Sequence, residues 1–160
     1  MEASSQTSQP RIFIPRQLGT ATHKSGLIDL TLTLENQPPL SPPTLAQLSA
    51  AVDFLTPDGG PGFLVLESNA GDYTQAAGGD GRFTAEWRMY SDCHFRHFVA
   101  GIPARRSVED VEIPTNGSVV TVKENEILDP DDVKAILVAF TQTRRLPQSF
   151  AWRDITQRFV

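Results

Sequence analysis

Residues 63–101 read FLVLESNAGDYTQAAGGDGRFTAEWRMYSDCHFRHFVAG, and this stretch decides the fold. Short apolar and aromatic runs alternate in it with turn residues such as Gly78-Gly79-Asp80-Gly81. Short strands joined by tight turns are typical of an antiparallel meander. The stretch therefore predicts successive antiparallel strands, with one strand in each run: Phe63–Ser68, Tyr73–Ala77, Arg82–Tyr90 and Cys93–Val99.

Further strands are predicted on both sides of this meander. Leucine and isoleucine alternate with polar residues over residues 28–35, which indicates a strand with one wet face. Asn116-Gly117 is a hairpin signal, although Pro114 predicts a loop longer than two residues. The other predicted strands are Arg11–Ile14, Val108–Ile113, Ser118–Val122 and Phe150–Ile155.

Two amphipathic helices complete the pattern. The first spans residues 44–55, with Ser41 as the expected cap and an apolar stripe of Leu45, Leu48, Val52 and Leu55. The second begins at Asp129 as N-cap, with Pro130 in its first turn. Its expected buried stripe is Val133, Ile136, Leu137 and Phe140.

The predicted class is α+β: a mostly antiparallel twisted sheet of about six to eight strands, with two helices packed on one face. Residues 11–160 are expected to form one domain, and residues 1–10 a disordered N-terminal tail. If both helices cover one face of the sheet, the other face is available to a partner.

Composition excludes several classes of protein. No apolar run approaches the roughly 18 residues of a membrane helix, and the formal net charge of −5 argues against nucleic-acid or anionic-membrane binding. The single cysteine, Cys93, excludes an internal disulfide and a multi-cysteine zinc site. The polar N-terminus does not resemble a signal peptide, so a cytoplasmic protein is expected.

Residues 92–97 bring together aspartate, cysteine and histidine, which are zinc-ligand types. Side chains alternate along a strand, so His94 and His97 are expected on opposite faces. No third ligand is within reach, and we expect no metal and no cofactor. Cys93 is interpreted as a small buried thiol and His97 as a half-buried core residue, not as a nucleophile and its base.

Glu86 and Arg88 are expected to share a strand face, with Arg96 on the next strand. A cross-strand ion pair is one interpretation. The alternative is a small enzyme or ligand-binding domain that uses these three residues, with Glu67 as the nearest candidate for a second acid.

Charge is distributed unevenly between Ser107 and Asp132, where eight acidic residues accompany only Lys123. A solvated face is one interpretation. The other is a patch that binds a basic partner, because acidic surfaces accelerate association with basic proteins. The acidic residues are Glu109, Asp110, Glu112, Glu124, Glu126, Asp129, Asp131 and Asp132.

Four short motifs between residues 60 and 158 resemble the Imm class of bacterial immunity proteins. They are Glu86-Trp87-Arg88, residues 113–117 (IPTNG), Ala139-Phe140 at the end of a helix, and residues 152–155 (WRDI). The resemblance implies a small intracellular α+β protein that neutralises a cognate toxin, of nuclease or deaminase type, by stoichiometric binding. It implies no catalytic residues.

The function hypothesis is therefore an immunity protein with a basic toxin as its partner, and not an enzyme. The candidate partner-binding residues are Glu86, Arg88, Glu109, Asp110, Glu112, Glu124, Glu126 and Trp152. Besides the small enzyme, a scaffold or assembly subunit remains open, and an extensive apolar surface patch is expected for it.

Overall fold

The computed structural model describes residues 29–160 of the chain. The predicted tail over residues 1–10 and the predicted strand Arg11–Ile14 lie outside this range. The described residues form an antiparallel six-stranded sheet, a separate two-stranded sheet and two α-helices. The predicted α+β class is confirmed.

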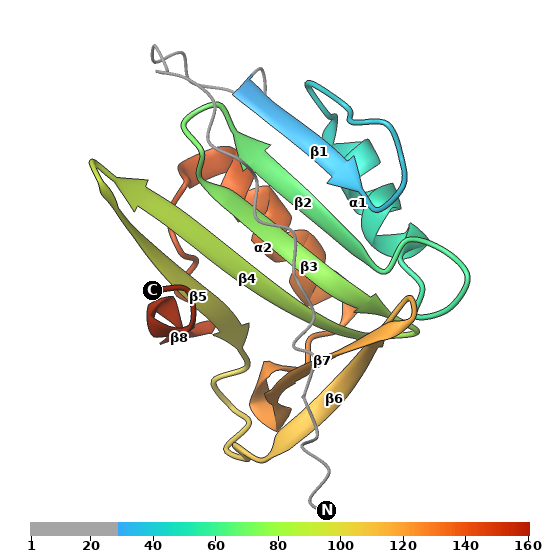
Figure 1. Ribbon diagram of the computed structural model, residues 1–160, viewed down its shortest axis with the longest axis vertical. Coiled ribbons are helices and arrows are strands. Elements are labelled where there is room, and N and C mark those ends of the chain that lie inside the picture. The colour runs from blue at the N-terminus through green and yellow to red at the C-terminus, as the bar shows by residue number, and fades with distance from the viewer. Residues whose placement is uncertain (1–28) are drawn as a thin grey trace, which may run out of the picture.

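The strands of the large sheet lie in the order β1-β2-β3-β4-β5-β8, and β6 pairs with β7 (Figure 1). The strands are β1 (Leu30–Leu34), β2 (Phe63–Ser68), β3 (Tyr73–Gly79), β4 (Arg82–Ser91), β5 (His94–Gly101), β6 (Asp110–Thr115), β7 (Ser118–Lys123) and β8 (Ala151–Asp154). The helices are α1 (Leu45–Phe54) and α2 (Pro130–Thr143), with short 3-10 helices η2 (Glu124–Glu126) and η3 (Thr156–Arg158).

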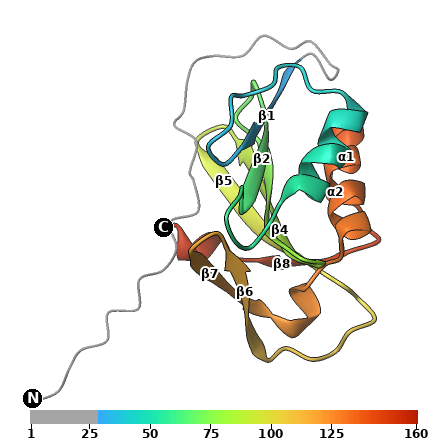
Figure 2. The same cartoon turned by 90° about the vertical axis from the view of Figure 1, so that its right-hand side faces the viewer.

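Both α-helices lie on one face of the large sheet, as Figure 2 shows. Alternation along β4 directs Phe83, Ala85 and Trp87 toward them, and all three are buried in the main core. The Trp87 ring meets Phe140 of α2 edge-on, with 4.9 Å between ring centroids. Burying these apolar side chains between the helices and the sheet provides the main driving force for the fold.

Helix α2 follows the prediction, whereas the start of α1 corrects it. Asp129 caps α2, and the predicted stripe of α2 is buried. The cap of α1 is Thr44, which forms a capping box with Gln47. The hydroxyl of Ser41 instead donates to the carbonyl of Leu30 and ties the loop to β1. Leu45, expected in the buried stripe, is exposed.

The β6–β7 hairpin lies at one end of the large sheet (Figures 1 and 2). The prediction of a longer loop around Pro114 is wrong, because Pro114 lies within β6 opposite Val119. The turn consists only of Asn116 and Gly117, both at positive φ, as tight hairpins require. Proline is accepted in β6 because its missing N–H falls at an outward-facing position.

The turn between β4 and β5 contains Asp92 and Cys93, so Cys93 precedes β5 and is exposed. The interpretation of Cys93 as a buried thiol is wrong. His94 is exposed and His97 is buried, in agreement with their expected opposite faces. His97 is nevertheless fully buried and not half-buried.

The second face of the large sheet was expected to be open, but its centre is buried. Tyr73, Gln75 and Val99 are nearly inaccessible there, and Phe159 stacks on His97. The C-terminal segment lies on this side, opposite the helices (Figure 2). Across residues 29–160, no helix has the length and apolar character needed to cross a membrane.

Candidate functional site

The predicted partner-binding residues lie in three different environments. Glu86 and Arg88 belong to a buried polar network on the second face of the sheet. Glu126 and Trp152 are held within the protein near β8. The remaining residues (Glu109, Asp110, Glu112 and Glu124) lie exposed on and beside the β6–β7 hairpin.

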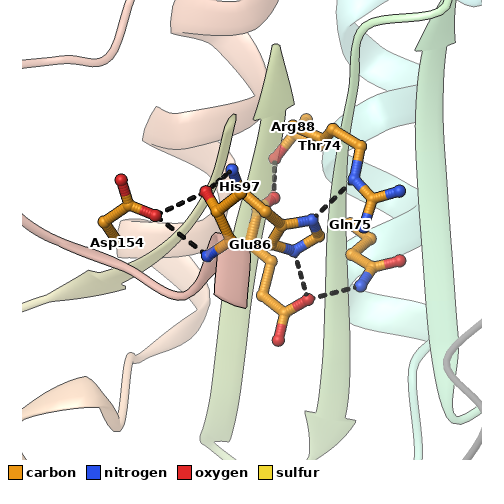
Figure 3. Close-up of polar contacts among 7 residues, drawn as sticks. Thr74, Gln75, Glu86, Arg88, His97 and Asp154 are labelled. Atoms are coloured by element: carbon orange, nitrogen blue, oxygen red, sulfur yellow. Dashed lines mark hydrogen bonds and ion pairs between the residues drawn. The ribbon is translucent and has the colours of Figure 1, made fainter. Parts of the chain in front are cut away.

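The buried network joins β3, β4 and β5 (Figure 3). Antiparallel register places Gln75 beside Glu86, and Arg88 beside His97. Gln75 Nε2 donates to Glu86 Oε2 at 2.6 Å, and His97 Nε2 lies 2.8 Å from the same oxygen. Arg88 Nε donates to His97 Nδ1 at 2.8 Å. The imidazole therefore bridges a carboxylate and a guanidinium.

This bonding assigns the tautomer of His97. A guanidinium N–H is only a donor, so Nδ1 must accept and the ring proton lies on Nε2, directed at Glu86. A hydrogen on Nδ1 would point at the N–H of Arg88, and two donors cannot form a hydrogen bond. Both ring nitrogens are thus engaged within the protein.

Aromatic rings enclose the same network. Phe159 stacks on His97 with 4.4 Å between centroids, and Tyr73 meets the imidazole edge-on. The Arg88 guanidinium lies over Phe95 and Phe159, at 4.2 and 4.5 Å. Burial also raises the pKa of the Tyr73 hydroxyl well above its usual value. The network is buried, with His97 0% exposed.

The structure does not bring Arg96 to Glu86 and Arg88. Arg96 lies on the other face of β5, where it stacks on Phe98 and forms an exposed ion pair with Asp154. The cavity beside Glu86 measures about 10 Å³, which is about the volume that one water needs. The three residues of the enzyme alternative therefore share no substrate-sized cleft.

Glu67, the candidate second acid, is not paired with Glu86. It lies opposite Tyr73, one strand further from Glu86 than Gln75. Desolvation by burial raises the pKa of Glu67, and also that of Asp72, above their ordinary values. Neither carboxyl joins the network around His97.

Glu126 and Trp152 have structural roles. Glu126 is only 2% exposed and binds the Arg153 guanidinium through both of its carboxylate oxygens. This ion pair raises the pKa of Arg153. Trp152 packs edge-on against Trp87 and donates its indole N–H to the carbonyl of Pro147. Glu126 is therefore buried in an ion pair, whereas Trp152 is partly exposed and lines, with Glu126, a hollow beside β8.

The outer face of the β6–β7 hairpin is exposed. We define it as Asp110, Glu112, Pro114, Val119, Thr121 and Lys123, whose side chains alternate with the buried Ile113, Val120 and Val122. Lys123 pairs with Asp110 at 2.7 Å, and their hydrogen bond lowers the pKa of Asp110. Glu109 and Glu124 adjoin the base of this face, and the carbonyl of Glu109 accepts from the N–H of Glu124.

An apolar tip on this face escaped the sequence analysis. Pro114 and Val119 are cross-strand neighbours near the turn, and Val119 is 41% exposed. The Asn116-Gly117 turn is the sequence signal for this tip, because a two-residue turn places Pro114 opposite Val119. The prediction assigned Pro114 to the loop, and this assignment left Val119 without a cross-strand neighbour.

A hollow of about 270 Å³ adjoins the base of the hairpin, and its lining includes Val108, Lys123 and Arg153. In the part of the chain from residue 29 onward, no group of three or more histidine, cysteine or carboxylate side chains is placed to hold a metal ion.

Comparisons with known proteins do not assign a family. A scan of family models found no match to the chain, and neither the search of curated proteins nor that of solved structures found a similar protein.

Proposed function

We propose that this chain is an immunity protein of a bacterial polymorphic toxin system. It binds a basic toxin domain, of nuclease or deaminase type, and neutralises it stoichiometrically in the cytoplasm of the cell that makes both. The observation that carries the proposal is the outer face of the β6–β7 hairpin at one end of the large sheet, where exposed carboxylates lie between an apolar tip and the base of the hairpin.

The charge of this surface suits a basic partner. Glu109, Asp110, Glu112 and Glu124 are exposed, whereas Lys123, the cation among them, already pairs with Asp110. Long-range attraction between opposite charges orients partners before contact and accelerates their association. A toxin domain that binds nucleic acid carries a basic surface for the phosphates, so one surface of the toxin serves both substrate and inhibitor.

The apolar tip contributes binding free energy that exposed charges alone do not provide. Exposed ion pairs contribute little free energy, and binding is dominated by a few desolvated apolar or aromatic contacts within a polar rim. Pro114 and Val119 provide such a centre, and the carboxylates form the rim. The buried network around His97 joins β3, β4 and β5 of the sheet, and an ordered scaffold of this kind lowers the entropy lost on binding.

The test begins with the gene beside this one, which should encode a toxin. The purified toxin domain, carrying an inactivating substitution, should bind the chain in a one-to-one complex. The double reversal Glu112→Lys with Glu124→Lys should weaken the complex by about 100-fold or more, because rim attraction becomes repulsion. Calorimetry or surface plasmon resonance measures the change.

Controls separate the surface from general charge effects. Asp58→Lys with Asp92→Lys adds the same charge at exposed loop positions outside the hairpin, and should change affinity by no more than about threefold. Glu126 is excluded from the reversals because it holds Arg153. Undiminished binding of the hairpin variant removes this surface from the interface, and a missing complex with the native chain removes the proposed function.

A further inference from the structure

The hydrogen-bond pattern of the β6–β7 hairpin shows which way each backbone group points. In a two-residue hairpin, the pair that flanks the turn exchanges both backbone bonds, and bonded pairs then alternate with non-bonded pairs. The pairs that exchange backbone hydrogen bonds are therefore Thr115 with Ser118, Ile113 with Val120, and Val111 with Val122. The bond from Glu124 N–H to the Glu109 carbonyl, at 2.8 Å, continues the same alternation.

The N–H and C=O groups of Val119 and Thr121 consequently point away from β6. Across residues 29–160, β7 has no strand neighbour except β6, and neither residue takes part in a backbone bond outside the hairpin. The next outward group, the N–H of Lys123, is already bonded to Glu126. Within the described residues, the part of the edge without a backbone partner thus spans Val119 to Thr121.

The neighbouring edges are closed by specific features. The N–H and C=O of Leu32 in β1 both bond to Leu40, at 2.9 Å each. Pro114 removes an outward N–H from β6. β8 offers only a short edge, because it has four residues. Proteins ordinarily protect edge strands in these ways, because an unpaired edge is a template for another strand.

We propose that the β7 edge is a strand-addition site, at which an extended segment of the basic toxin domain pairs with Val119 and Thr121 and extends the hairpin to three strands. This inference rests on the proposed function and specifies its contact mode. Two N–H and two C=O groups are offered, and main-chain pairing provides affinity while side chains provide selectivity.

Charge identifies the occupant of the β7 edge. A strand added to β7 lies two strand spacings from Glu112, roughly 10 Å, within the combined reach of a glutamate and a lysine or arginine side chain. This distance is slightly longer than the Debye length of about 8 Å at physiological salt, so the attraction is partly screened there. The cations at the base of this edge are already paired, Lys123 with Asp110 and Arg153 with Glu126, so Glu112 is left to attract the segment.

The first experiment follows backbone amide exchange by nuclear magnetic resonance, in the free chain and in its complex with the inactivated toxin domain. We expect the amides of Val119 and Thr121 to exchange rapidly when free and slowly in the complex. Val120 and Val122, bonded to β6, should exchange slowly in both states. Slow exchange of Val119 and Thr121 in the free chain, or fast exchange in the complex, overturns the proposal.

The second experiment is a matched pair of substitutions. Thr121→Pro removes the outward N–H without breaking a bond to β6, as Pro114 already does on the neighbouring strand. Thr121→Ala removes the side chain and keeps the N–H. We expect the proline variant to lose about tenfold or more in affinity for the toxin domain, and the alanine variant about threefold or less.

The outcomes separate this inference from the proposed function. Equal losses in both variants, or no loss in either, overturn strand addition and leave the proposed function standing. No complex with the native chain overturns both. If the free native chain is a dimer that Thr121→Pro converts to a monomer, a second copy occupies the edge and the inference is wrong.

Discussion

His97 illustrates how neighbouring residues determine the chemistry of a side chain. Its two nitrogens differ only in their partners: Arg88 donates to one, and Glu86 accepts from the other. The same constellation on an open surface would be a candidate for proton transfer. Here the ring contacts Tyr73 and Phe159 and no solvent, so it orders the sheet.

Replacing Arg88 with methionine tests this role. Arg88→Met keeps most of the side-chain volume but removes the donor to His97 and the guanidinium from a buried network that includes Glu86. Breaking a buried charged network leaves an uncompensated charge, so we expect a loss of about 3 kcal/mol in the free energy of unfolding. Urea denaturation followed by circular dichroism measures it.

Arg96→Met is the matched control at the residue scale. Arg96 pairs with Asp154 at the surface, where water and salt screen the attraction. The loss should be much smaller than for Arg88→Met. If the two variants lose equal stability, the network around His97 is not the element that orders the sheet.

A carboxylate, that of Asp154, organises the C-terminal element. The side chain of Asp154 accepts from the hydroxyl and backbone N–H of Thr156, and also from Arg96. This anchors η3, from which Phe159 reaches His97. These hydrogen bonds, that of the Thr156 hydroxyl first, lower the pKa of Asp154 to about 2.

The lowered pKa predicts how stability depends on pH. The native state favours the ionised carboxylate, so the contribution of Asp154 is present above its unfolded pKa, near about 4, and is lost as the pH falls toward 2. Asp154→Asn should therefore be less stable than the native chain at pH 6, and the gap should narrow as the pH approaches 2. A gap that stays constant with pH would show that the charge is not responsible.

At the scale of the whole molecule, the fold separates charges that are adjacent in sequence. Of the acidic residues between Ser107 and Asp132, Glu126 is buried against Arg153, and Asp129 and Asp132 cap α2. Asp131 lies in the first turn of α2. The other four, Glu109, Asp110, Glu112 and Glu124, are exposed at the hairpin, while Arg96 and Arg153 lie at β5 and β8. The molecule therefore presents an acidic end at the hairpin.

This charge distribution predicts kinetics that depend on salt. Raising the ionic strength from 0.05 to 0.5 M should slow association with the toxin domain by about tenfold, because the Debye length falls below the separation at which steering acts. The dissociation rate should change far less. The variant Glu112→Lys with Glu124→Lys should lose this salt dependence, as stopped-flow fluorescence can measure; an unchanged dependence would place the steering charges elsewhere.

Local pattern was sufficient for most elements. The bounds of β2 and the cap of α2 follow from the residues between turn signals, and from an aspartate that precedes a proline. The errors fell where two local signals competed. Ser41 and Thr44 both suit a cap, and only Thr44 has Gln47 three residues later to complete the capping box. A proline such as Pro114 indicates a loop when it is considered alone. In a paired hairpin it also fits a strand position whose N–H points outward, and Pro114 occupies such a position.

Short runs between turn residues established the antiparallel meander, helical spacing of apolar residues established the two helices, and alternation along a strand established the shared face of Glu86 and Arg88. These features depend on residues close in sequence. The burial of His97 under Phe159, the pairing of Glu126 with Arg153 and the exposure of Val119 required the folded molecule. They depend on which distant segments meet, and period and spacing along a single strand or helix contain no information about contacts between segments far apart in the chain.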